Sequence, residues 1–203
     1  VKYNTSTTTK SSDTLKSEII TAVTNYNTNT LQKFDAVYRH SKLTGIIDDV
    51  DTSILSNITT IKIRKSFTPT LSSSTKYDIY FRNALFNPHS GHNATAGGIL
   101  SSTGFKVTGS DFEQFLDDDG NGNVRRYYLS SGIRTYSNET QGTIDYSTGQ
   151  ITLNSLNIAS ISNIRGSTST VIELTVTPDS NDVVPVRDQI VEIDVANSSI
   201  TVT

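Results

Sequence analysis

Cysteine, methionine and tryptophan are all absent from this chain of 203 residues. Without cysteine the chain can form neither a disulfide framework nor a thiolate metal site, so its redox compartment stays undecided. Without methionine, Val1 cannot be an initiator residue, and we expect the chain to be a piece of a longer or a processed polypeptide. Because tryptophan is missing and aromatic residues make up only 8%, the composition does not favour a sugar-stacking cleft.

The chain also lacks an excess of positive charge and any long apolar run. It carries 17 Lys and Arg against 20 Asp and Glu, a net charge of -3, whereas nucleic-acid binding needs a basic face. No segment approaches the roughly 18 consecutive apolar residues that cross a bilayer, and residues 1–10 lack the apolar centre of a signal peptide. We therefore expect neither a nucleic-acid partner nor a membrane partner.

The familiar motifs of nucleophilic and phosphate chemistry are missing. There is no Gly-x-Ser-x-Gly elbow and no Walker loop, since "GGILSSTG" lacks the lysine that a P-loop requires. Carboxylate pairs for glycoside cleavage meet only in the fold, and Glu113, Asp117 and Asp145 are candidates that nothing in the sequence distinguishes. We predict no catalytic residues and no cofactor.

Two histidines, His89 and His92, occur close together in "HSGH". A metal site also needs a third ligand and supporting groups around the ligands. His40, the remaining histidine, belongs to a different region, and residues 83–98 contain no carboxylate. We interpret residues 83–98 as a surface loop and predict no metal site there.

Residues 116–128 read "LDDDGNGNVRRYY" and match half of an EF-hand calcium loop. Oxygen side chains fall at loop positions 1, 3 and 5, and a glycine falls at position 6. Position 12, which needs a bidentate carboxylate, is Tyr128, and two guanidinium groups, Arg125 and Arg126, would repel the ion. We therefore predict a β-hairpin with a Gly-rich turn, in which the two arginines neutralise the aspartates beside them.

Two stretches near the N-terminus have the apolar spacing of helices. Ser11 or Ser12 can cap the first, with Asp13 in a favourable first-turn position, and residues 25–30, "NYNTNT", are predicted to end it. The apolar positions of the two predicted helices are Leu15, Ile19, Ile20, Val23 and Tyr26, and then Leu43, Ile46, Ile47 and Val50.

After Asn57 the apolar period changes to two, which is typical of strands. The alternation covers Ile58, Ile61 and Ile63 and then residues 75–83. Residues 142–153, "GTIDYSTGQITL", are predicted to form a hairpin around a Ser-Thr-Gly turn. Further strands are predicted at 169–178 and 189–203.

These elements predict an α+β fold, in which a small domain of two helices and a β-sheet carries an inserted, mostly antiparallel β domain. We place the α+β domain at residues 1–82 and the inserted β-rich domain at residues 83–165. Strands from residues 166–203 are expected to return to the first domain, because its sheet would otherwise be small and open.

Four segments, at residues 31–69, 116–129, 142–158 and 177–194, are together similar to the C-terminal portion of a baseplate wedge protein of T-even-type, contractile-tailed phages, related to the baseplate J family. The resemblance implies a structural virion protein, made late in infection and assembled in the host cytoplasm. Its copies would form a homodimer and join neighbouring wedges into a ring around the tail hub. The implied partners are other wedge proteins and the sheath-initiating subunit, and the family offers no catalytic residues to transfer.

An assembly protein needs self-complementary patches, and Tyr and Arg are enriched at the centres of interfaces. Arg125, Arg126, Tyr127 and Tyr128 are therefore candidate interface residues. The alternative is that they are ordinary strand residues with alternate faces buried.

Two other functions compete with the structural role. The acidic composition, rich in Ser, Thr and Asn, is also typical of a glycan-binding or adhesin β-module. A tail-associated glycosidase is the third hypothesis, and it would need a pair of the carboxylates named above.

Overall fold

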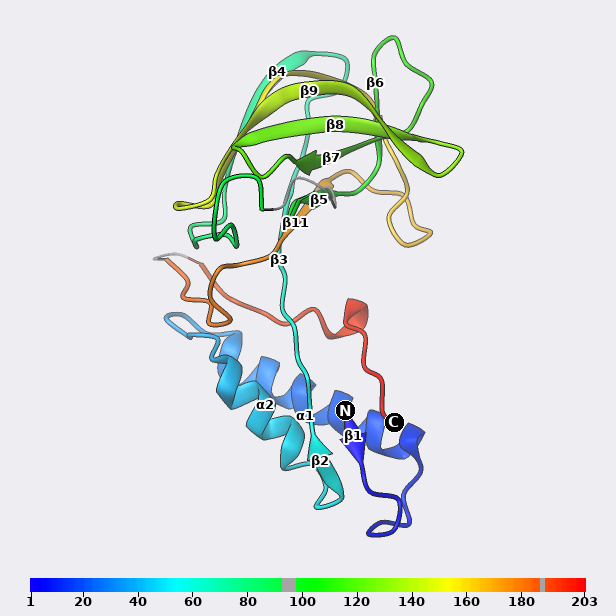
Figure 1. Cartoon of the computed structure of the whole chain (residues 1–203), viewed down its shortest axis with the longest axis vertical. Coiled ribbons are helices and arrows are strands. Elements are labelled where there is room, and N and C mark those ends of the chain that lie inside the picture. The colour runs from blue at the N-terminus through cyan, green and yellow to red at the C-terminus, as the bar shows by residue number, and fades with distance from the viewer. Residues whose placement is uncertain (93–97, 187–188) are drawn as a thin grey trace. The chain divides into compact units, whose positions relative to one another are not determined.

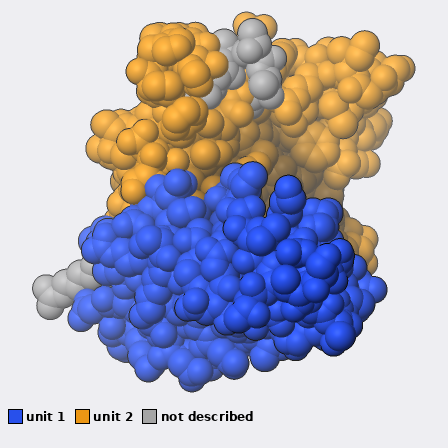
Figure 2. All heavy atoms as spheres, turned by 60° about the horizontal axis from the view of Figure 1, so that its bottom comes forward, with its two compact units in different colours: residues 1–60, 181–203 blue, residues 61–180 orange. Residues whose placement is uncertain are grey.

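A computed structural model describes residues 1–92, 98–186 and 189–203, so parts of the predicted loop 83–98 and of the segment 177–194 lie outside the described residues. The chain divides into two compact units, with residues 1–60 and 181–203 in unit 1 and residues 61–180 in unit 2 (Figures 1 and 2). These boundaries differ from the predicted ones, because the strands between residues 63 and 80 pair inside unit 2. Contacts do not test independent folding, so the domain assignment stays a prediction.

Unit 1 is built on two helices. The first, α1 (Ser12–Tyr26), has Ser11 as its N-cap, whose side chain accepts a hydrogen bond from the Thr14 N–H at 3.2 Å, and Asp13 lies in its first turn. The second is α2 (His40–Asp48). The predicted apolar spacing is confirmed, since these helices bury Leu15, Ile19, Val23 and Tyr26, and Leu43 and Ile47.

The first α-helix ends at Tyr26, inside the stretch predicted to end it. The chain does not leave the helical path there, however, but continues as the π-helix η1 (Asn27–Leu31), which the sequence did not predict. Asn27 is buried there, and its side-chain oxygen accepts a hydrogen bond from the Ile193 N–H at 2.7 Å. A contact with a distant segment of the chain therefore holds the asparagine-rich stretch in a widened helical turn.

A small sheet completes unit 1. Strand β1 (Lys2–Tyr3) pairs antiparallel with β2 (Ile54–Ser56), and on its other side the Tyr3 N–H donates to the Thr203 carbonyl at 3.1 Å. The strand predicted at residues 189–203 was wrong, because the described residues there form an extended segment interrupted by the 3₁₀ turn η2 (Val195–Asn197), which Asp194 caps. The strand predicted from Ile58 begins only at Ile63, and Ile58 itself is 92% exposed.

Unit 2 contains a sheet that closes on itself. Its strands are β4 (Ser74–Tyr80), β6 (Phe105–Val107), β7 (Gln114–Asp118), β8 (Asn123–Ser130), β9 (Ile133–Asp145) and β10 (Gln150–Ile161). The order is β4-β10-β6-β7-β8-β9, and β9 pairs back to β10, so five of the strands form a closed ring (Figure 1). At this closure Gly142 pairs with Leu153, and a Cβ at Gly142 would collide with the Thr152 carbonyl oxygen.

A second sheet packs with this ring around one core. It consists of β3 (Ile63–Phe67), β11 (Ile172–Val176) and β5 (Ser101–Ser102), in the order β3-β11-β5. Phe105, Leu116 and Val124 from the ring belong to the same buried cluster as Ile172 and Leu174 from β11. The antiparallel hairpins β7–β8 and β9–β10 confirm the two predicted hairpins, and the α+β fold class is confirmed as well.

Candidate functional site

The β7–β8 hairpin carries the four predicted interface residues, and its register separates them onto two faces. Residues that pair across antiparallel strands point to the same side of the sheet. Arg126 pairs with Leu116, whose side chain is buried in the core, so Arg126 starts from the inner side of the ring. Arg125 pairs with Asp117 on the outer side. Tyr127 lies on the outer side with Arg125, and Tyr128 lies on the inner side with Arg126. The four residues therefore do not form one continuous patch.

The outer side is organised around the buried carboxylate of Asp117, which is 1% exposed. Its Oδ1 atom accepts a hydrogen bond from Arg125 Nε at 2.9 Å. Its Oδ2 atom accepts bonds from Arg134 Nη1 at 2.7 Å and from the Tyr136 hydroxyl at 2.9 Å. Burial raises the pKa of Asp117, and the hydrogen bonds from Arg125 and Tyr136 act against that rise. We call these residues, together with Tyr127, the outer cluster.

Aromatic rings cover both arginines of the outer cluster. The Arg125 guanidinium lies 4.3 Å from the centre of the Tyr136 ring, and the Arg134 guanidinium lies 4.7 Å from the centre of the Tyr127 ring. Such contacts add to the ion pairs when the cation is partly desolvated. Burial raises the pKa of Tyr127 and also that of Tyr136. The side chains of the outer cluster are therefore paired with one another by ion pairs, a hydrogen bond and cation–π contacts.

The sequence did not point to Arg134 or Tyr136, although they supply two of the five residues of the outer cluster. Both lie on β9, where Tyr136 pairs with Tyr127 and Arg134 pairs with Leu129. The available signal was the alternation of Arg134 and Tyr136 after the Ser131-Gly132 turn, which places them on the same face as Tyr127.

The inner side presents Arg126 and Tyr128 near one end of the ring. Arg126 Nε donates to the Ser137 hydroxyl at 3.2 Å, and that hydroxyl donates to Gln114 Oε1 at 2.6 Å. Burial lowers the pKa of Arg126. In the described part of the chain, no carboxylate lies within ion-pair distance of Arg126. Tyr128 stacks on Phe112 with ring centres 4.5 Å apart.

The three aspartates of the half-matched calcium loop hold three separate structures. Asp117 belongs to the outer cluster, whereas Asp118 Oδ1 accepts the backbone N–H groups of Ile99 at 2.7 Å and Leu100 at 2.8 Å. Burial, and then a 2.6 Å hydrogen bond to Asp118, raise the pKa of the Tyr146 hydroxyl. Asp119 accepts bonds from within its own turn, including the Asn121 N–H at 2.8 Å. These carboxylates brace the hairpin and its neighbours instead of converging on one point.

The remaining residues that the sequence offered as metal ligands or catalytic carboxylates do not come together in one site within the described residues. His92 Nδ1 lies 3.0 Å from His89 Nε2, and among the described residues no group of three or more His, Asp or Glu could hold a metal ion. Asp145 caps a turn, where hydrogen bonds from Ser147 and Thr148 lower its pKa to about 2. The Glu113 side chain packs over Gly104. Within the described ranges, no helix is both long enough and apolar enough to span a membrane.

The fold and these surfaces define an α+β protein whose most elaborate polar clusters hold strands together. Residues 1–66 match a family model described as "Baseplate structural protein gp6, C-terminal domain III". The matched region covers α1, α2, β1 and β2 and reaches into β3. A comparison with curated proteins found no match. The family match supports a structural role in a phage baseplate, and it therefore points to the virion and to assembly with other baseplate proteins.

Proposed function

We propose that this chain is a structural, non-enzymatic component of the baseplate of a contractile-tailed phage. It belongs to a wedge protein of the T-even type, related to the baseplate J family. It pairs with itself as a homodimer, and it contacts other wedge proteins and the sheath-initiating subunit in the ring around the tail hub. The single observation that carries this proposal is the match of residues 1–66 to a baseplate structural family.

The surfaces of unit 2 support a role in packing. Asp117 forms ion pairs with Arg125 and Arg134 in the outer cluster. These charges connect neighbouring strands and are not available to activate a substrate. Tyr127 and Arg125 contribute aromatic and cationic side chains to that face, and these residue types are enriched at interface centres. Arg126 and Tyr128 offer a second contact surface on the inner side of the ring.

The proposed location can be tested on virions of the encoding phage. The protein is a late product that joins the baseplate in the host cytoplasm, so an antibody against residues 1–203 should label the distal end of the tail in electron micrographs. An antibody against the major capsid protein is the matched control and should label only the head. The baseplate assignment would be overturned if the antibody labelled another part of the particle, or if it labelled neither intact nor contracted tails.

Self-pairing is tested separately by sedimentation velocity of the purified chain over a range of concentrations. We expect the sedimentation coefficient to rise from that of a monomer to that of a dimer. A glycan array with the same preparation should give no binding. Glycan binding by a strictly monomeric chain would instead favour an adhesin module.

A further inference from the structure

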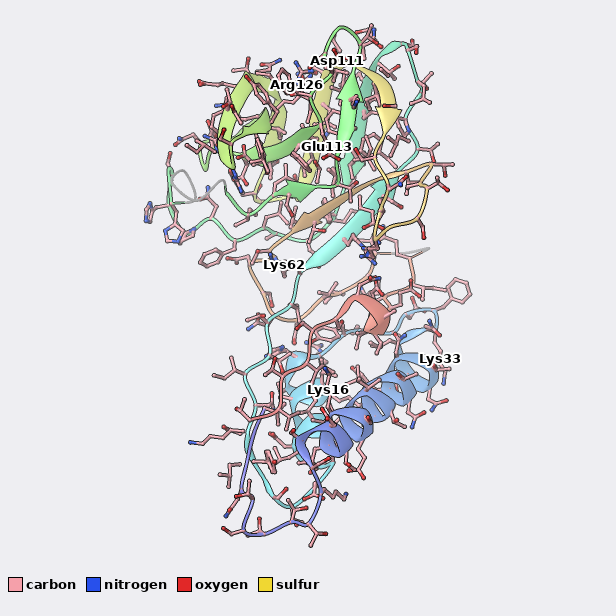
Figure 3. All side chains as sticks on the ribbon, turned by 90° about the vertical axis from the view of Figure 1, so that its right-hand side faces the viewer. Lys16, Lys33, Lys62, Asp111, Glu113 and Arg126 are labelled. Atoms are coloured by element: carbon pink, nitrogen blue, oxygen red, sulfur yellow. The ribbon has the colours of Figure 1, made fainter. Side chains whose placement is uncertain are left out.

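One end of unit 2 carries two opposite charges, each without an ion-pair partner among the described residues. Arg126 and Asp111 are labelled at this end in Figure 3. Asp111 is exposed, and within the described residues neither group has an ion-pair partner. Phe112, which follows Asp111 in the chain, stacks on Tyr128, which lies two residues after Arg126 on β8. We call Asp111, Phe112, Arg126 and Tyr128 the rim patch.

A chain of hydrogen bonds joins the two ends of the rim patch. Arg126 Nε donates to Ser137, which donates to Gln114, and Gln114 Nε2 donates to the Ser110 hydroxyl at 3.3 Å. Ser110 is the residue before Asp111, and its hydroxyl also accepts the Phe112 N–H at 3.3 Å. The backbone on either side of Asp111 is thus linked to Arg126, although the two charged groups do not form an ion pair with each other.

The position of Arg126 favours a carboxylate partner. The side chain is half-buried, and burial lowers its pKa because the guanidinium is desolvated. Its Nε atom is used by Ser137, while the described residues provide no acceptor for its terminal nitrogens. A carboxylate can meet such nitrogens through charge-assisted hydrogen bonds that are stronger than neutral ones.

The centre of the rim patch is apolar and accessible. The Phe112 ring is 57% exposed, and it is held nearly parallel to the Tyr128 ring at an interplanar angle of 19°. A cation and an anion that both lack an ion-pair partner among the described residues, together with an exposed aromatic ring beside the anion in the chain, make the surface self-complementary. In a two-fold contact, residue i of one copy meets residue j of the other copy and j meets i.

We propose that two copies of this chain pair through the rim patch, with Arg126 of each copy bound to Asp111 of the other and the Phe112 rings between them. This inference rests on the proposed self-pairing, and it names the surface and the charges that carry it. The occupant is a second copy, because this surface supplies both members of the ion pair itself.

Charge reversal provides the test, with dimerisation of the full chain measured by sedimentation equilibrium. A two-fold dimer contains the contact between residues 111 and 126 two times. Asp111→Arg turns each of these contacts into a pair of arginines, and Arg126→Asp turns each of them into a pair of aspartates. We expect each variant alone to weaken dimerisation at least tenfold. An equimolar mixture of the two variants restores both attractive pairs, so it should dimerise like the original chain, and so should the double variant D111R/R126D.

Matched variants separate this contact from general effects. Glu113→Arg reverses an exposed acid two residues from Asp111 and should leave dimerisation unchanged. Phe112→Ala should weaken it without charge repulsion. Because Asp111 is exposed, D111R remains informative even where R126D fails to fold, which circular dichroism would reveal.

The outcomes distinguish this proposal from the broader one. An original chain that stays monomeric overturns both self-pairing and the rim patch. If the D111R variant dimerises as strongly as the original chain, the rim-patch proposal is overturned and self-pairing is left intact. The same conclusion follows where folded single variants are weakened but their mixture is not restored, or where Glu113→Arg is as disruptive as D111R.

Discussion

Unit 1 and unit 2 reach a buried core by different routes. In unit 1 the buried apolar residues lie mainly on two helices, where local spacing places Leu15, Ile19 and Val23 on one face. In unit 2 they come from strands far apart in the sequence, and Phe105, Leu156 and Ile172 meet only when the ring closes. Local patterns are therefore enough to build much of unit 1, whereas unit 2 depends on long-range pairing.

The two units also differ in their buried charges. Unit 2 buries the carboxyl groups of Asp117 and Asp118 almost completely and surrounds them with donors. In unit 1 the comparable ion pairs, such as Lys10 with Glu18, lie nearer the surface. Because of this difference, we expect that replacing a charged residue of these pairs lowers the free energy of unfolding more in unit 2 than in unit 1.

The largest effect is expected from emptying the core of unit 2. Phe105 is 0% exposed, so Phe105→Ala should lower the free energy of unfolding by about 3–5 kcal/mol, through lost burial and the cavity left behind. The measurement is urea denaturation followed by circular dichroism, with hydrogen exchange and mass spectrometry to locate the loss. If the units fold separately, exchange should accelerate in residues 61–180 and not in residues 1–60.

The matched control for this prediction lies in unit 1. Phe34 is 76% exposed, so Phe34→Ala should change the free energy of unfolding by less than about 0.5 kcal/mol. Equal acceleration of exchange in both units after Phe105→Ala would show that they unfold as one body.

A smaller effect is expected from removing the centre of the outer cluster. Asp117→Ala leaves Arg125 and Arg134 without their shared acceptor, and we expect a loss of about 2–4 kcal/mol because one of these arginines stays partly exposed. Arg126→Ala serves as the comparison, because it removes a cation for which the described residues supply no acidic partner. It should change stability by less than about 1 kcal/mol, since it breaks one hydrogen bond. Similar losses for both variants in urea denaturation would contradict this separation of roles.

The sequence indicated those features that depend on neighbouring residues. Ser11 as a helix cap and the Ser-Thr-Gly turn of the β9–β10 hairpin each follow from chemistry within a few positions. The alternation at residues 189–203 failed as a strand signal over most of its length, because Asp194 caps a 3₁₀ turn and Ile193 bonds to Asn27. Only the end of the segment, at Thr201 and Thr203, makes backbone hydrogen bonds to residues 1–3. A period of two does not determine whether a partner strand is present.

The candidate site was predictable only in part for the same reason. Arg125 and Asp117 face each other across a hairpin, so their pairing follows from the register of two adjacent strands. Arg134 and Tyr136 enter from the next strand, and the division of Arg125 from Arg126 depends on which side of β7 is buried. The buried side of β7 packs against strands far away in the sequence, which no local pattern revealed.

The smallest expected effect compares one carboxylate in each unit as the pH falls. Hydrogen bonds from Lys10 and then Ser53 lower the pKa of Asp51 in unit 1 to about 2, and those from Ser147 and Thr148 lower the pKa of Asp145 in unit 2 to about 2. A carboxyl group whose pKa is lower in the folded state stabilises that state at pH values above its ordinary pKa, here 3.8. That contribution is lost as the pH falls from 3.8 towards 2.

Asp51→Asn should therefore reduce the pH dependence of the stability of unit 1 in this window and leave that of unit 2 unchanged. Asp145→Asn should reduce the pH dependence of unit 2 and leave that of unit 1 unchanged. Each change removes at most one proton from the slope of stability against pH, which is why the effect is small. Pepsin is active in this window, so limited cleavage followed by mass spectrometry reports the opening of each unit separately. If either substitution alters the acid response of both units equally, they share one unfolding transition, and the contrast between a locally built unit and a ring-closed unit would not extend to their stability.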